Sequence, residues 1–190
     1  MKMFTRIKFT IAANKLIKSM GGNPKNPTIN EMIVAGPILL LSAKRKHSPV
    51  FSNNYVCADA ILITCEYAMK ILEGTGAPDY VTSDIKDKMA SAIQREFSIS
   101  GSELLEMQKN RLSFFGRLLD KHPNDISPMI EEAALVFSYD LAHDRYVEYA
   151  EDSPLIILGI DKQMQIESEA LEFFHAALKL VTDYISQYFL

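Results

Sequence analysis

The sequence predicts an all-α protein, a single-domain helical bundle of six or seven helices around a buried central helix at about residues 53–73. Four observations support this prediction. The stretch from Tyr55 to Leu72 is apolar around most of a helical circumference, and helix-start signatures recur along the chain. The two-residue alternation typical of strands is absent, and no internal repeat divides the 190 residues. We therefore expect one helical domain.

The central stretch reads YVCADAILITCEYAMKIL. At about 100° per residue, Asp59, Glu66 and Glu73 fall on one narrow stripe, and Lys70 lies on the same stripe. The rest of the helix is apolar or small, so it needs neighbours on several sides. The acidic stripe is expected to be the helix's only route to solvent, with Glu66 and Lys70 forming an ion pair. The alternative is a row of inward carboxylates that could bind a metal.

The only two cysteines, Cys57 and Cys65, lie on this same helix. Eight residues of helix separate them by about 12 Å, whereas a disulfide needs Cα atoms within about 7 Å. Free thiols with apolar neighbours indicate small core residues in a reducing compartment. The N-terminus shows no secretory signal, so we expect a cytoplasmic protein. The net charge of -4 gives no general attraction to nucleic acid.

Charge is distributed unevenly along the chain. Residues 1–30 contain six basic groups and no acid, which leaves fourteen basic and twenty-four acidic groups in the remaining 160 residues. A basic amphipathic helix is predicted at about residues 2–20. Such a helix can pack on the acidic body, act as a targeting signal, or contact an anionic membrane surface, and packing is favoured. Its apolar residues are expected on two adjoining rows, Phe4, Ile7 and Ile11 on one and Phe9, Ala13, Leu16, Ile17 and Met20 on the other.

Further helices follow from capping signatures. Thr28 and Glu31 form a capping box that begins a helix running to about Arg45, and Pro37 is expected to kink or end it. The basic cluster 44–47 suits the C-terminal end of that helix. The other predicted helices span 83–97, about 100–122 (with Leu104 and Leu105 inward), 127–151 and 161–190. The last one has an expected core seam of Leu171, Phe174, Leu178, Val181, Ile185 and Tyr188, with Glu172 and His175 on its polar face.

Candidate chemistry lies on the 127–151 helix. Its apolar face continues into Asp140 and Asp144, and His143 lies on the flank of that face. Carboxylates on an apolar face are costly unless they are paired, hydrogen-bonded or bound to a cation. The pairing alternative is an ion pair with a basic residue of the N-terminal helix or with Arg145, Arg111 or Arg117.

The doublet His143-Asp144, within the sequence LAHD, resembles the motif of the HD-domain metal-dependent phosphohydrolases, which are also all-helical. The resemblance implies that His143 and Asp144 are ligands of a divalent metal. It also implies an upstream histidine, for which His122 is the candidate, and a downstream aspartate, either Asp161 or Asp183.

A different reading rests on the tyrosines around the same turns. Tyrosine is enriched at protein interfaces because its ring is apolar and its hydroxyl can stay hydrated. The leading hypothesis is therefore a non-enzymatic protein-binding module without a cofactor, such as an inhibitor, immunity or regulatory protein. The metal-dependent phosphohydrolase and a membrane-surface protein that binds through residues 2–20 are the alternatives, and homo-oligomerisation stays open. The predicted partner-binding residues are Tyr139, Asp140, Asp144, Tyr146 and Tyr149.

Overall fold

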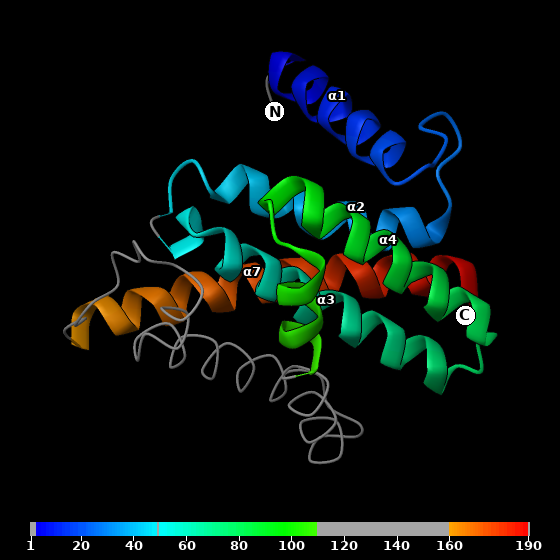
Figure 1. The fold of residues 1–190 in the computed structure, drawn as a ribbon. Helices are drawn as coiled ribbons and strands as arrows, with labels where there is room; N and C mark the ends of the chain where they lie inside the picture. The colour runs from blue at the N-terminus through cyan, green and yellow to red at the C-terminus, as the bar shows by residue number, and fades with distance from the viewer. Residues whose placement is uncertain (1–2, 49, 110–159, 190) are drawn as a thin grey trace.

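The structure is a computed structural model that describes residues 3–48, 50–109 and 160–189. These residues form helices and no strand, which confirms the all-α prediction. Figure 1 shows α2, α3, α4 and α7 packed together, with α1 outermost on one side. None of the described helices combines the length and apolar character needed to cross a membrane. In order, the elements are α1 (Met3–Ser19), α2 (Ile29–Lys44), the short 3-10 helix η1 (Val50–Ser52), α3 (Asn54–Gly74), α4 (Asp79–Phe97), a helical segment at 101–109, and α7 (Ile160–Phe189).

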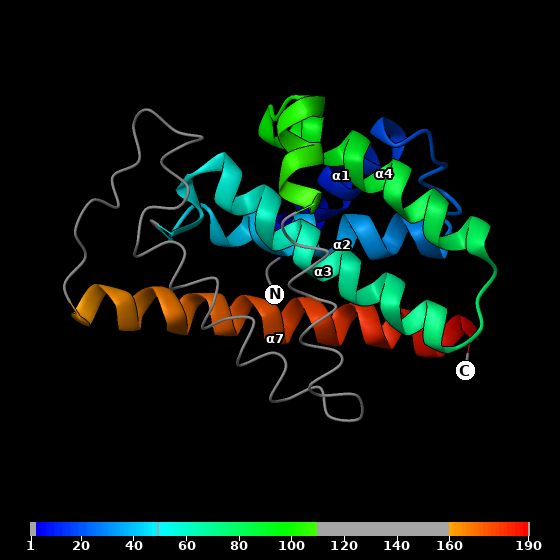
Figure 2. The same ribbon diagram turned by 60° about the horizontal axis from the view of Figure 1, so that its bottom comes forward.

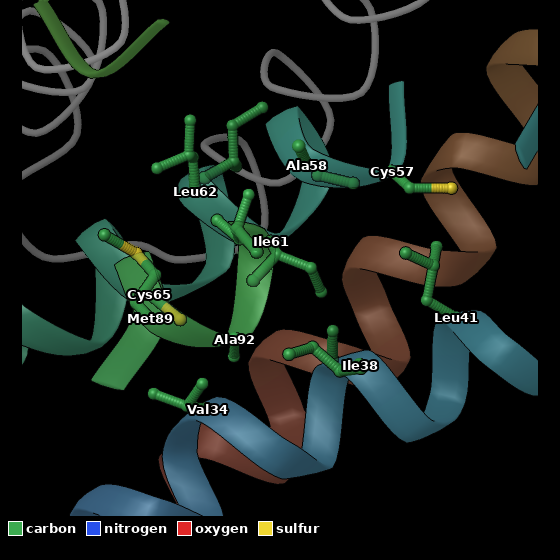
Figure 3. Close-up of a cluster of buried hydrophobic side chains, with 14 of the residues drawn as sticks. Val34, Ile38, Leu41, Cys57, Ala58, Ile61, Leu62, Cys65, Met89 and Ala92 are labelled. Atoms are coloured by element: carbon green, nitrogen blue, oxygen red, sulfur yellow. The ribbon is translucent and has the colours of Figure 1, made fainter. Parts of the chain in front are cut away.

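Helix α3 is the buried centre of the bundle, as the sequence predicts. Asn53 caps it by accepting hydrogen bonds from the backbone N–H groups of Tyr55 and Val56. Every residue from Val56 to Met69 is buried, and α2, α4 and α7 all contact the helix. Figure 3 shows side chains of α2 and α4 converging on Ile61 of α3, and Figure 2 shows α7 running beneath α3 along most of its length.

Helix α2 begins at the predicted capping box. The Thr28 hydroxyl accepts from the Glu31 N–H, and the Glu31 carboxylate accepts from the Thr28 N–H. The prediction that Pro37 kinks or ends the helix is wrong in its second part, because α2 continues to Lys44. At the preceding residue, a Cβ added to Gly36 would lie 2.7 Å from Leu180 Cδ2. This close packing against α7 supports the helix across the break that proline makes in its hydrogen bonds.

Helix α4 begins one turn earlier than its sequence signature indicates. The predicted start was Ser83, but the helix begins at Asp79 with Pro78 at the N-cap. The extra turn buries Val81, which adds one residue to the core row. Four predicted core residues of this helix are buried, which confirms the row: Ile85, Met89, Ile93 and Phe97.

The segment at 101–109 begins with a second confirmed capping box, in which Ser100 and Glu103 exchange hydrogen bonds. Leu104 is buried as expected, but Leu105 is 53% exposed, so the prediction that both leucines point inward is wrong. Two adjacent helical residues point about 100° apart, and only one of this pair reaches the core.

Helix α7 is the longest described helix and packs against α2 and α3. Phe173 is fully buried, with ring centroids 5.4 Å from both Phe51 and Phe174. Tyr188 was expected in the core seam but is 59% exposed, because it lies in the last turn of the helix at the end of the bundle. The other members of the seam are buried or partly buried: Leu171, Phe174, Leu178, Val181 and Ile185.

Helix α1 packs on the body through its C-terminal turns. Leu16, Ile17 and Met20 are buried, and the Arg95 side chain of α4 donates to the backbone carbonyl of Ser19. Ile11, in contrast, is 63% exposed. The two apolar rows of this helix are therefore not adjoining, because nine residues separate Ile11 from Met20 and nine steps of about 100° bring them to opposite sides.

Candidate interaction surface

The site predicted from sequence lies outside the described residues, so its assignments stay predictions. It consists of Tyr139, Asp140, His143, Asp144, Tyr146 and Tyr149, together with His122 as a further metal ligand. Within residues 3–48, 50–109 and 160–189, no group of three or more histidine, cysteine, aspartate or glutamate side chains is placed to hold a metal ion.

Helix α7 carries Asp183, one of the candidate metal ligands, and the residues His175 and Glu172 of its predicted polar face. Asp183 is exposed, with its carboxylate 2.9 Å from Lys179 Nζ. His175 is also exposed, and Glu172 accepts from Lys44 Nζ at 2.6 Å. The predicted polar face of α7 is therefore present, and these groups point away from the core.

The acidic stripe of α3 was expected to reach solvent, and this prediction is wrong for its first two turns. Asp59 is 1% exposed and Glu66 is 4% exposed. Only the end of the stripe is open, where Lys70 Nζ lies 2.7 Å from Glu73 Oε2, so Lys70 pairs with Glu73 instead of Glu66. Charge spacing identifies one side of a helix, but it does not say whether a neighbour covers that side.

Burial raises the pKa of the Glu66 carboxyl above its ordinary value of 4.5. The positive charges of Lys86 and Lys70 oppose this shift, and the nearby Glu73 adds to it. Removing a carboxylate from water disfavours its charged form, so this side chain keeps its proton to a higher pH than a surface glutamate does.

The raised pKa predicts a pH-dependent effect of Glu66→Gln. Between the ordinary pKa and the raised one, the native state binds the proton more tightly than the unfolded state, so the wild type loses stability as pH rises through that window. Glutamine does not titrate, and the variant should therefore gain stability relative to the wild type as pH rises above about 4.5. Urea unfolding from pH 4 to pH 8 measures this difference. Glu73→Gln, on the exposed end of the same helix, is the control, and a difference independent of pH for Glu66→Gln would contradict the assignment.

The basic end of α2 is largely used inside the fold. Lys44 pairs with Glu172, and the Arg45 guanidinium lies 5.7 Å from the centre of the Phe97 ring and donates to Asn54 Oδ1 at 2.7 Å. These contacts join the end of α2 to α3, α4 and α7, so Lys44 and Arg45 have a structural role, whereas Lys46 and His47 are exposed.

Both cysteines are buried thiols with little nucleophilic character. Burial raises the pKa of Cys57 to about 12, opposed by the charge of Arg45, and burial together with the charge of Glu66 raises the pKa of Cys65 above its usual range. The Cys57 thiol donates to the Phe51 carbonyl oxygen at 3.1 Å. The thiolate is the reactive form of cysteine, so thiol catalysis is not supported at either position.

Exposed aromatic side chains gather at one end of the bundle, which we call the tyrosine end and define by Tyr80, Tyr184 and Tyr188. Tyr80 is 73% exposed at the start of α4, and Tyr184 and Tyr188 lie one turn apart at the end of α7. Both ribbon views place the start of α4 and the end of α7 at the same end of the molecule (Figures 1 and 2). Burial raises the pKa of Tyr184, and Tyr188 adds to that shift. Tyr184 is thus partly buried, whereas Tyr80 and Tyr188 are exposed.

Sequence reasoning missed the tyrosine end for two reasons. The range predicted for this helix, 83–97, begins one turn late and leaves Tyr80 outside it, and Tyr188 is predicted to lie in the core seam. Extending the α4 row back to Val81 places Tyr80 about 100° off that row, which is the signal that would have identified it as exposed.

Comparison of this chain with protein-family models, with curated proteins and with solved structures finds no match. The function is therefore argued from the chain's own surface and chemistry.

Proposed function

We propose that this chain is a non-enzymatic module that binds another protein, as inhibitor, immunity and regulatory proteins do. The observation that supports this most is the tyrosine end, where two tyrosines expose more than half of their surface beside a third. Exposed aromatic side chains that gather in one place are typical of protein interfaces, where tyrosine supplies apolar area and a hydroxyl that can hydrogen-bond. The proposal requires no metal or organic cofactor.

The charge around the tyrosine end gives the proposed surface an acidic character. Glu73 closes α3, Asp79 opens α4 and Asp183 lies on the last turns of α7, and all three are exposed. Lys70 and Lys179 each pair with one of these acids. The tyrosine end thus combines acidic groups with tyrosines, as is expected for residues 139–149. A partner surface with basic and apolar groups would complement either of them.

The test uses a photo-reactive phenylalanine analogue introduced in place of Tyr80, and separately in place of Tyr188, in the full chain in cells. We expect both positions to crosslink the same partner. The matched control is the analogue in place of Leu105, which is exposed to a similar degree on another element. With that partner, Tyr80→Ala combined with Tyr188→Ala should cost about 2 kcal/mol or more of binding free energy, as hot-spot residues do. Crosslinks of equal yield from position 105, or none from positions 80 and 188, would count against the proposal.

A further inference from the structure

Helix α1 has two sides, and the described fold uses only one of them. Leu16, Ile17 and Met20 are buried against the body, which α1 contacts through α2 and α4. Figure 1 shows these two helices on one side of α1 and no other described helix beyond it. Ile11, on the opposite side, is the most exposed aliphatic side chain among the described large hydrophobic residues. A single exposed apolar side chain is ordinary, so the composition of the row to which Ile11 belongs is what bears on a partner.

The outer row of α1 is defined by Ile11, Lys15 and Lys18, which are all exposed, and the helical positions of Phe4 and Ile7 fall on the same line. At about 100° per residue, all of them lie within roughly 40° of Ile11. The apolar members occupy the first half of the row and the lysines the second half, and both lysines are exposed. No acidic residue occurs anywhere in residues 1–30.

The composition of this row distinguishes between two classes of partner. Protein interfaces are depleted in lysine and enriched in arginine and tyrosine. Every basic residue of the outer row is a lysine, and the one arginine of α1, Arg6, lies about 140° away from Ile11 around the helix. Lysine beside phenylalanine and isoleucine is typical of a helix lying in a membrane interface, where lysine stems lie on apolar surface and their charges reach the headgroups.

We propose that the outer row of α1 docks on an anionic lipid surface. The helix lies in the plane of the headgroups with Ile11 turned toward the lipid, while Leu16, Ile17 and Met20 hold the bundle on the other side. Lys15 and Lys18 supply the attraction to anionic headgroups. Residues 31–190 carry ten more acidic than basic groups, so an anionic surface repels the body and orients the chain with α1 toward it.

The test is co-sedimentation of the full chain with vesicles of phosphatidylcholine and phosphatidylserine at low salt. Each of the two lysines is attracted to the anionic surface. The double variant Lys15→Glu/Lys18→Glu loses both attractions and should therefore bind at least roughly 30-fold more weakly. Ile11→Ser should weaken binding by roughly tenfold. These three side chains are exposed, so thermal unfolding of both variants should match the wild type.

Two matched controls separate the row from general charge and apolarity. Lys25→Glu makes one lysine-to-glutamate exchange, half the charge change of the double variant, at an exposed loop position beyond α1, and Leu105→Ser removes an exposed apolar side chain from another element. Both should bind the mixed vesicles within about twofold of the wild type, since neither position lies on the row. Vesicles of phosphatidylcholine alone should bind the wild type at least roughly tenfold more weakly.

Three results would overturn the proposal. The first is equal loss of vesicle binding in the row variants and in the two controls. The second is equal binding to phosphatidylcholine vesicles with and without phosphatidylserine. The third is a wild-type dimer in sedimentation equilibrium that Ile11→Ser converts to a monomer, because the row would then dock on a second copy of the chain. Each of these leaves the protein-binding proposal for the tyrosine end intact, since that end is tested at other positions.

Discussion

Replacing Ile61 by aspartate is expected to unfold most of the chain at neutral pH. Ile61 is fully buried on α3, and Figure 3 shows it among Val34 and Ile38 of α2 and Met89 and Ala92 of α4. An unpaired carboxylate in apolar surroundings costs several kcal/mol. We expect a loss of about 4 kcal/mol or more in the free energy of unfolding, which is a large part of the 5–15 kcal/mol typical of a domain. Urea unfolding followed by circular dichroism measures it.

The control for this prediction introduces the same aspartate elsewhere on α3. Lys70 is exposed, and Lys70→Asp removes its surface ion pair with Glu73 and its positive charge near Glu66, without placing a carboxylate in the core. Such pairs contribute about 0–1 kcal/mol, so this variant should stay close to the wild type. If Ile61→Asp were destabilised no more than Lys70→Asp, α3 would not be enclosed on the side that carries Ile61.

Phe173→Ala is expected to have the second largest effect, a loss of about 3–5 kcal/mol in the free energy of unfolding. The Phe173 ring is fully buried on α7 and lies 5.4 Å from the rings of Phe51, in η1, and Phe174. Alanine removes the ring, its contacts and the tilted arrangement of three aromatic groups, and it leaves a cavity that the surrounding helices cannot fill. The same urea unfolding experiment measures the change.

Two further variants make the result specific. Phe173→Leu keeps most of the apolar volume and should lose less than the alanine variant. Tyr188→Ala removes an aromatic ring of similar size from the exposed end of the same helix, and we expect a change within about 0.5 kcal/mol. Equal losses in Phe173→Ala and Tyr188→Ala would show that η1 and α7 do not form a packed aromatic core.

The central helix was predictable because its evidence is local. A run from Val56 to Met69 that is apolar on nearly every side can be stable only when other elements surround it. The capping boxes at Thr28 and Ser100 were predictable for the same reason, since the residues that form each one lie within a single helical turn.

Features that depend on neighbouring elements were harder to predict. The spacing of Asp59 and Glu66 places both on one side of α3, but burial depends on what packs there. Pro37 removes a hydrogen bond wherever it occurs, yet close packing of Gly36 on α7 keeps α2 continuous. For Tyr188, the periodicity continues to the end of α7 although the neighbouring helices do not cover it. In each case the sequence gives the residue type and its side of the helix, but the packing of the other helices determines whether that side is buried.

The tyrosine end, which we propose as a binding surface, has the chemistry that the sequence predicts for residues 139–149, but it lies at other positions. An acidic surface bearing tyrosines was expected at Tyr139–Tyr149, outside the described residues, and the described part of the chain presents the same combination at the tyrosine end. The outer row of α1 was visible in the sequence as an apolar row. The nine helical steps from Ile11 to Met20 already place the two rows on opposite sides, and the burial of Leu16 and Met20, with Ile11 exposed, shows which row packs on the body.

Hydrogen exchange at individual backbone amides can show whether α3 is enclosed while the outer part of α1 has neighbours on one side only. The account predicts that amides from Val56 to Met69 exchange most slowly and open only with global unfolding. Amides near Ile11 should exchange much faster, by local opening of α1. Exchange in the middle of α3 as fast as that near Ile11 would contradict the account, because a helix surrounded by α2, α4 and α7 cannot open while they remain folded.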